Sequence, residues 1–232
     1  MQFFIVVLLI CLFVFLYCVY LLGNDDFIFL RKDVTMEKLF NIVFLGSLSS
    51  LFFARLFYGL FQEKAILSNP FVFLLFPYFP GLSIIGSVLG IAAFFGILKR
   101  WKKDLPLERM SDFFSIAFLV TLPIGTIGYF MFAEAGFSIQ RALGLVVAYI
   151  ILFILFLRFL LPQLLKDKIK EGTIALIFLL SFSVVNFVDG GMGKGNAVSY
   201  LISADGIILI LLFLSSVRLL IKQENLLSKF KR

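Results

Sequence analysis

The sequence predicts an all-α membrane protein, a polytopic bundle of about seven transmembrane helices in one integral-membrane domain that covers residues 1–232. Of its 232 residues, 62% are hydrophobic and only 15% are charged, and the mean hydropathy is +1.09. A soluble domain carries roughly a quarter charged residues, so this composition is that of a chain in a bilayer. The apolar runs are long and unbroken, which excludes the alternating strands of a membrane β-barrel and leaves helices.

Seven apolar runs are predicted to cross the bilayer, because a spanning helix needs about 20 mostly apolar residues. The first run has no basic segment before it and no small-residue cleavage site after it, which favours a retained helix over a signal peptide. Pro162 is expected to end the fifth. The expected spans are Phe3–Leu22, Leu39–Phe61, Gly81–Leu98, Phe113–Ala133, Ala142–Leu161, Ile174–Val188 and Ile202–Ile221.

Two connections have an unusual composition. The apolar part of the second connection, Pro70–Pro80, is too short to span, so it either lies in the interface or re-enters the membrane. The stretch Gly190–Gly195 after the sixth span lacks the Gly-Lys-Ser/Thr ending of a phosphate-binding loop and follows no strand. It is expected to be a flexible external loop.

The basic residues predict an amino terminus outside the cell and a carboxyl terminus in the cytoplasm. Of the 21 Lys and Arg residues, Arg55 lies within a span and only Lys64, Arg141 and Lys194 then face outward, which leaves 17 on the cytoplasmic side. The reverse orientation inverts this ratio, so the positive-inside rule supports only the first.

Composition also argues against several classes of site. The chain has no histidine, and both of its cysteines, Cys11 and Cys18, lie inside the first span. Small apolar packing roles are therefore expected for the cysteines, and no metal site or cofactor is expected. The net charge of +7 comes from short basic clusters between the spans, which is typical of membrane topology and not of nucleic-acid binding.

Arg55 is the one charged residue well inside a predicted span. A charge there costs roughly 2.5–3.5 kcal/mol on insertion scales, so it needs a partner. It either extends to the headgroups, pairs with Glu63 or Glu134, or clamps a lipid phosphate with its planar guanidinium. Tyr58, three residues later, shares its helix face and is otherwise typical of an interfacial aromatic belt.

Other polar residues lie at the outer ends of spans. Glu134 follows the fourth span, and Asn186 and Asp189 end the sixth. Such boundary residues are either simply solvated or take part in catalysis or lipid orientation.

Glycine pairs mark two predicted helices. Gly86 and Gly90 have the G-x-x-x-G spacing of a close helix-packing face, with a serine between them. Gly125 and Gly128 lie one turn apart in the fourth span, just before Tyr129. Both pairs are expected to allow close packing or to line a cavity.

Three motif-like stretches follow one another along the chain. The first is residues 46–58, which end in ARLFY, and the second is residues 83–90, SIIGSVLG, with Leu105-Pro106 in the following basic loop. The third is residues 125–134, GTIGYFMFAE. Together they resemble the "GARLGY", "SFHGGLIG" with "KLP", and "GRIGNFINxE" motifs of the bacterial prolipoprotein diacylglyceryl transferase family. The seven predicted spans agree with that family, and the resemblance covers most of residues 35–221.

The motifs depart from the family at its polar positions. Arg55, Tyr58, Gly125, Gly128, Phe130 and Glu134 match. The family histidine falls on Ile85, the signature arginine on Thr126, and the two signature asparagines on Tyr129 and Phe132. In the sixth span the arginine of the family's "GRFxxE" is Asn186, with an acid one position early.

The resemblance implies transfer of a diacylglyceryl group from phosphatidylglycerol to a cysteine of a prolipoprotein signal peptide, in a bacterial inner membrane. It implies that Arg55, Tyr58 and Asn186 bind the lipid phosphate and that Glu134 and Tyr129 serve catalysis. Because the histidine and two arginines are absent, two alternatives stay open: a rebuilt active site, or a non-catalytic relative that binds lipid or signal peptide. A small-solute transporter is a third reading, which the lack of an internal repeat disfavours.

Overall fold

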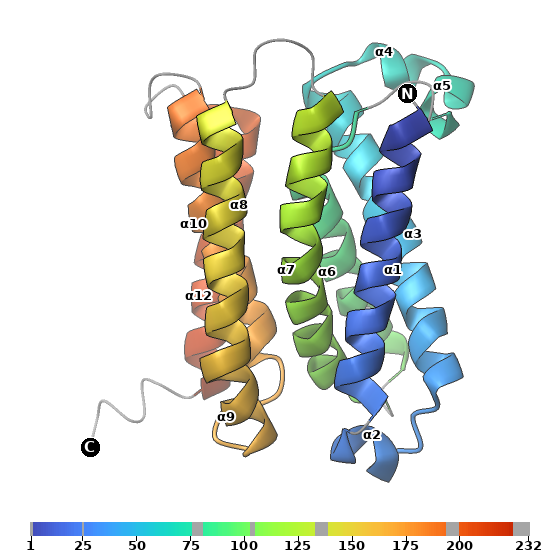
Figure 1. Cartoon of the computed structure of the whole chain (residues 1–232), viewed down its shortest axis with the longest axis vertical. Coiled ribbons are helices and arrows are strands. Elements are labelled where there is room, and N and C mark those ends of the chain that lie inside the picture. Colours follow the sequence, from blue (N-terminus) through green and yellow to red (C-terminus); the bar gives the residue numbers. More distant parts are fainter. Residues whose placement is uncertain are drawn as a thin grey trace. The chain divides into compact units, whose positions relative to one another are not determined.

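The structure is a computed structural model that describes residues 2–24, 26–75, 81–102, 105–132, 139–193 and 200–224. Every regular element in these ranges is a helix, and seven helical stretches are long and apolar enough to cross a membrane (Figure 1). The predicted all-α architecture with seven spans is thereby confirmed. The chain divides into two compact units, Met1–Leu107 and Glu108–Arg232, and each is described by itself.

The first unit is built on three candidate spans. They are accompanied by one short helix after the first span and two after the second. The elements are α1 (Gln2–Asn24), α2 (Phe27–Arg31), α3 (Met36–Phe61), α4 (Ala65–Ser68), α5 (Pro70–Leu74) and α6 (Ile84–Trp101). Thr35 begins α3 as its N-cap, since its hydroxyl accepts a hydrogen bond from the Lys38 N–H at 3.3 Å.

Helices α3 and α6 pack closely through the G-x-x-x-G face. A Cβ on Gly86 would lie 2.6 Å from the Phe53 carbonyl oxygen, and one on Gly90 would lie 2.8 Å from that of Ser49. The Ser49 hydroxyl donates to the Gly90 carbonyl oxygen at 3.0 Å. Only glycine lets the two backbones approach this closely.

Replacing Gly90 with valine is expected to lower the free energy of unfolding by about 1–3 kcal/mol, because the added methyl groups must displace the α3 backbone. Thermal unfolding in detergent micelles, followed by circular dichroism, measures this. The matched control is Gly96→Ala on the same helix, where a Cβ meets nothing within 4 Å. If Gly90→Val were as stable as Gly96→Ala, the α3–α6 contact would be wrong.

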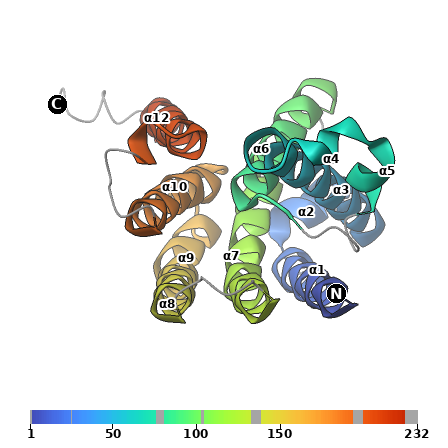
Figure 2. The same ribbon diagram turned by 90° about the horizontal axis from the view of Figure 1, so that it is seen from above.

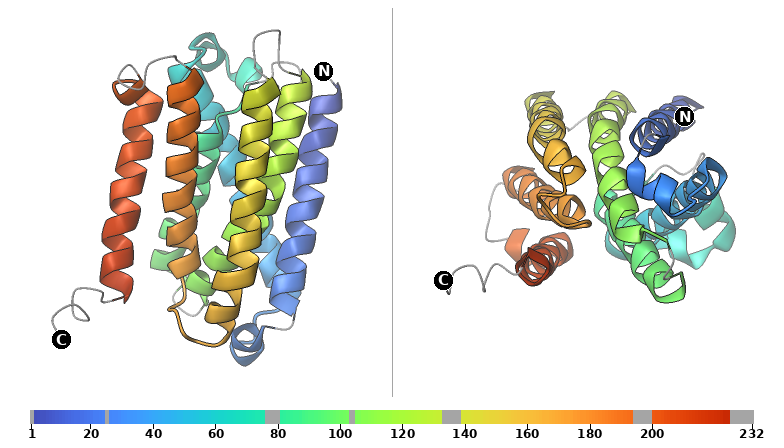
Figure 3. Two further views of the ribbon diagram at one scale, coloured as in Figure 1. Left: turned by 60° about the vertical axis from the view of Figure 1, so that its left-hand side comes forward. Right: turned by 90° about the horizontal axis from the view of Figure 1, so that it is seen from below.

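The second unit holds the other four spans. They are α7 (Leu107–Phe132), the run of α8 (Ile139–Leu155), the π-helix η1 (Phe156–Leu160) and α9 (Leu161–Leu165), then α10 (Thr173–Gly193) and α12 (Ala204–Glu224). Helix α10 lies between α8 and α12 (Figure 2). Figure 3 shows α8, η1 and α9 continuing as one rod.

Buried polar groups hold the start of α10 to the start of α7. The Asp112 carboxylate is fully buried and accepts hydrogen bonds from the Gly172 N–H at 2.6 Å and the Ala175 N–H at 2.8 Å. A carboxylate is favourable there because the first N–H groups of a helix lack partners within it and carry partial positive charge. Arg109, also buried, donates to the Leu164 carbonyl oxygen at 3.2 Å and lies over the Phe113 ring.

Three predicted boundaries are wrong. The fifth span does not end at Pro162, because that residue lies in the first turn of α9, where a missing N–H is tolerated, after the wider turn of η1. The fourth span begins six residues before Phe113. Arg109 and Asp112, which precede Phe113, are buried in α7 rather than left in a loop.

The third error concerns the glycine-rich stretch, of which Gly190–Gly193 is helical and continues α10. These glycines provide space and not flexibility. A Cβ on Gly190 would lie 2.0 Å from the Tyr200 ring, and one on Gly193 would lie 2.1 Å from the Arg141 guanidinium. Residues 194–195 lie outside the described ranges.

Candidate functional site

Arg55 is buried in the first unit, with 2% of its surface exposed. Its guanidinium donates to three carbonyl oxygens: Nε to Phe73 at 3.3 Å, Nη2 to Val72 at 2.9 Å and Nη1 to Gly81 at 2.8 Å. Two of these carbonyls belong to the last turn of α5, where helix carbonyls lack partners within the helix and attract a cation. In this structure, therefore, the guanidinium bonds to the chain itself.

Tyr58 lies on the same face of α3 and packs against the same segment. A Cβ on Gly81 would lie 2.2 Å from the Tyr58 ring, and Gly81 has φ +150°, which favours glycine. Arg55 and Tyr58 are thus brought together at Gly81, one by a hydrogen bond and the other by ring packing.

The second unit carries a polar cluster where α8 begins and α10 ends, which we call the Arg141 cluster. It consists of Arg141, Tyr149, Asn186, Asp189 and Tyr200. Arg141 and Asp189 form a bidentate ion pair, with Nε–Oδ1 at 2.5 Å and Nη2–Oδ2 at 2.6 Å. Such fork-to-carboxylate pairs combine charge with a defined geometry.

Asn186 lies one helical turn from Asp189 on α10. Its amide nitrogen donates to the Tyr149 hydroxyl at 3.0 Å and to the Phe182 carbonyl oxygen at 2.8 Å. The Tyr149 side chain is almost fully buried. Asn186 therefore joins α10 to α8 beneath the ion pair.

Tyr200, the last member of the cluster, lies in the connection that precedes α12. Burial, together with the nearby carboxylates of Asp205 and Asp189, raises the pKa of its phenol to about 12. The phenol consequently stays protonated at neutral pH and can donate a hydrogen bond. Tyr129, which is largely exposed on α7, interacts electrostatically with Arg141.

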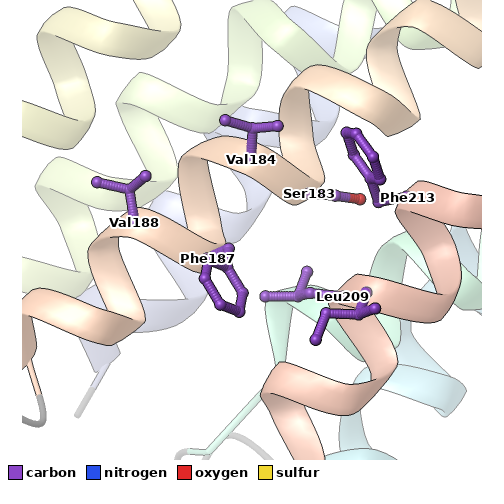
Figure 4. A pocket seen from close by; sticks show the side chains of 7 residues that line it. Ser183, Val184, Phe187, Val188, Leu209 and Phe213 are labelled. Atoms are coloured by element: carbon purple, nitrogen blue, oxygen red, sulfur yellow. The ribbon is translucent and has the colours of Figure 1, made fainter. Parts of the chain in front are cut away.

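An apolar groove lies between α10 and α12. On α10 its lining residues are neighbours in sequence of Asn186 and Asp189 of the Arg141 cluster. The volume of the groove is about 230 Å³. The Phe187 ring lines the groove and also packs edge-on against Tyr200, with ring centroids 5.5 Å apart. Figure 4 shows the groove's lining side chains, Ser183, Val184, Phe187, Val188, Leu209, Ile210 and Phe213.

The remaining predicted site residues are placed as follows. Gly128 is buried and Gly125 is half-buried on α7. Between them the Thr126 hydroxyl, at the position of the family's signature arginine, donates to the Leu122 carbonyl oxygen at 2.8 Å. Ile85, at the position of the family histidine, is buried at the start of α6. Glu134 lies outside the described residues.

The structure therefore brings Arg55 together with Tyr58 in the first unit. In the second unit Asn186 bonds to Tyr149, and Tyr129 interacts electrostatically with Arg141. The sequence analysis did not identify Arg141, Tyr149 and Tyr200 as site residues. Arg141 was considered only in the count of basic residues for the topology. A signal was present: Asn186 and Asp189 share one face of their helix, so they require polar partners on a neighbouring helix.

Asp189→Asn keeps the shape of the side chain and removes its charge. We expect a loss of about 1–3 kcal/mol in the free energy of unfolding, because a half-buried guanidinium is left without its carboxylate. Thermal unfolding measures the loss, and a double-mutant cycle with Arg141→Gln should show strong coupling. The control, Asp167→Asn, makes the same change at an exposed position with φ +52°, which asparagine also tolerates. Equal effects of the two substitutions would contradict the ion pair.

No model of a known protein family matches the chain. A curated protein does match it, the phosphatidylglycerol–prolipoprotein diacylglyceryl transferase of Fusobacterium nucleatum subsp. nucleatum, at 35% identity over 104 residues. These residues are 45% of this chain and 35% of the relative, so the match spans about a third of that enzyme's length. The predicted resemblance is confirmed: over nearly half of its length, this seven-span helical chain is similar to a prolipoprotein diacylglyceryl transferase.

Proposed function

We propose that this chain is a divergent diacylglyceryl transferase, with phosphatidylglycerol as the donor and the cysteine of a prolipoprotein signal peptide as the acceptor. The observation that carries the proposal is the 35% identity over 104 residues to an enzyme with that activity in its name. The seven apolar helices support it, because both substrates lie in the membrane.

The reaction makes two demands on the protein. The cysteine sulfur forms a bond to the glyceryl carbon, while the bond from that carbon to a phosphate oxygen breaks and glycerol phosphate leaves with the electron pair. The thiol proton must pass to a base, and the charge of the leaving phosphate must be stabilised by a cation or hydrogen-bond donors.

The resemblance assigns the phosphate to Arg55, Tyr58 and Asn186, and the proton to Glu134 and Tyr129. In this structure the Arg55 and Asn186 donors already bond to the chain. A phosphate at Arg55 would therefore have to replace three carbonyl groups.

The Arg141 cluster offers a rebuilt site instead. A phosphate that displaces Asp189 from Arg141 gains a bidentate cation and releases a carboxylate as a base for the thiol proton. Tyr200 and Tyr129 supply phenols beside the pair. The apolar groove next to it provides a place for an acyl chain of the donor. By the charge bias this end of the bundle faces outward, and the protein acts at the outer leaflet of a bacterial inner membrane.

The direct test is complementation of a bacterium depleted of its own transferase, with lipidation of a reporter prolipoprotein as the readout. The chain should restore lipidation, while Arg141→Gln should reduce it by at least tenfold, because removing a preorganised charge stabiliser commonly costs factors of about 10²–10³ in rate. Gly96→Ala serves as the neutral control. Absence of lipidation from a chain that is expressed and inserted would defeat the proposal.

The second candidate is a non-catalytic relative that binds phosphatidylglycerol or a signal peptide. The bonds of Arg55 to three carbonyl groups, together with Ile85 and Thr126 at the family's polar positions, favour it. Purified protein in nanodiscs distinguishes the two candidates: this one predicts saturable retention of labelled phosphatidylglycerol without any thioether product.

A further inference from the structure

We propose that α5 is a re-entrant element, held by Arg55 within the membrane, whose Phe71 and Leu74 side chains contact the acyl chains of the adjacent leaflet. The proposal concerns the described residues 69–75 and 81–83 beside α3, and it does not depend on the proposed enzymatic activity.

The contacts of this segment place it beside the last turns of α3. Arg55 lies six residues before Phe61, the last residue of the helix, which is about 9 Å along the axis. The Phe73 ring of α5 packs edge-on against Phe52, deeper still, with ring centroids 5.6 Å apart. The chain thus leaves α3 at Phe61 and comes back down along it.

The length of α3 indicates how deep this segment lies in the membrane. Its 26 residues extend about 39 Å, against a hydrocarbon core of about 30 Å. The polar residues Glu37 and Lys38 lie at the other end of α3, so the excess length belongs mainly there. The carbonyl groups that bind Arg55 are therefore inside the apolar layer and not above it.

A backbone at that depth needs internal hydrogen-bond partners, because hydrocarbon supplies none. Arg55 supplies three N–H donors, to Val72, Phe73 and Gly81. At the other end of α5, the Asn69 side chain accepts from the Phe71 N–H at 3.0 Å. This explains why a buried arginine is placed inside an apolar span: it satisfies the carbonyl groups of a short element that cannot do so alone.

The start of α6 agrees with this arrangement. The Ser83 N–H donates to the Ala54 carbonyl oxygen at 3.0 Å, so α6 begins at the level of Ala54 and not at that of Phe61. Helix α6 consequently has only 18 residues, and α5 lies beside the upper part of α3 (Figures 1 and 2).

Two large apolar side chains of α5 face outward at this depth. Phe71 is 75% exposed and Leu74 is 70% exposed. In water these two side chains would be an unfavourable patch, whereas acyl chains solvate them at no cost. At this depth the molecules next to the Phe71 and Leu74 side chains are expected to be lipid acyl chains.

A single-tryptophan depth measurement tests the proposal. Trp101 is the one tryptophan of the chain, so Trp101→Phe gives a silent background into which Phe71→Trp is introduced. The reference variant is Gln62→Trp, at the exposed C-cap of α3. Both are reconstituted in nanodiscs whose phosphatidylcholine is brominated at defined acyl carbons, and iodide in the buffer serves as the aqueous quencher.

We expect bromolipid to quench Phe71→Trp at least twofold more than Gln62→Trp, and iodide to quench it at least twofold less. Strong iodide quenching of Phe71→Trp with no bromolipid quenching would overturn the proposal and place α5 in water. Protection from both quenchers would also overturn it, because a protein surface would then cover the face.

Discussion

Arg55→Ala is expected to lower the free energy of unfolding by about 3–5 kcal/mol, because three carbonyl groups in an apolar setting lose a charged donor. The side chain is almost fully buried, so water cannot easily replace the guanidinium. Arg55→Lys should recover only part of the loss, since one ammonium group lacks the planar fork that reaches Phe73, Val72 and Gly81 together.

Thermal unfolding in nanodiscs measures the effect, and Arg158→Ala is the matched control at an exposed position in η1. Protease cleavage near α5 gives a second readout, because the segment should become accessible when its anchor is removed. If Arg55→Ala abolished diacylglyceryl transfer and left both readouts unchanged, Arg55 would act on substrate and our structural role for it would be wrong.

Asp112→Ala is expected to lower the free energy of unfolding by about 2–4 kcal/mol, because two N–H groups at the start of α10 lose a charged acceptor. The carboxylate also interacts electrostatically with buried Arg109, which would keep its charge without this partner. Asp112→Asn retains one carbonyl oxygen and should lose less.

The control for Asp112 is Glu37→Ala, which removes an exposed carboxylate from the first turn of α3. A solvated acid at a helix start contributes only about 0.3–1 kcal/mol, so a clear difference between the two variants is expected. Hydrogen exchange of the first turn of α10 localises the effect. Equal melting temperatures for the two variants would show that Asp112 does not cap α10.

The fold was predictable because membrane-spanning helices can be recognised in a sequence from the length and hydropathy of their apolar runs. All seven spans were found, and the G-x-x-x-G spacing of Gly86 and Gly90 pointed to the close contact that α6 makes with α3. The errors fell where tertiary contacts override local preference. Pro162 is accommodated by a π-turn, and Gly190 and Gly193 remain helical, with Tyr200 and Arg141 filling the space beside them.

The polar contacts were less predictable, because they join residues far apart in the sequence. Arg55 donates hydrogen bonds to backbone carbonyl groups 17 to 26 residues away. Because every residue has a backbone carbonyl, the sequence does not indicate which of them accept. Arg141 and Asp189 are 48 residues apart. Opposite charges near two span ends suggest a pair only when the helices that carry them are known to be neighbours.

The most direct test of the proposed function uses the purified protein in nanodiscs that contain phosphatidylglycerol with a labelled diacylglyceryl group. A reporter prolipoprotein peptide is added, and mass spectrometry follows its cysteine. The proposed function predicts that the peptide gains one diacylglyceryl group in thioether linkage, and that Arg141→Gln and Asp189→Asn each slow this gain while Asp167→Asn does not. Retained labelled lipid with an unmodified cysteine would contradict transferase activity and establish the protein as a lipid-binding relative.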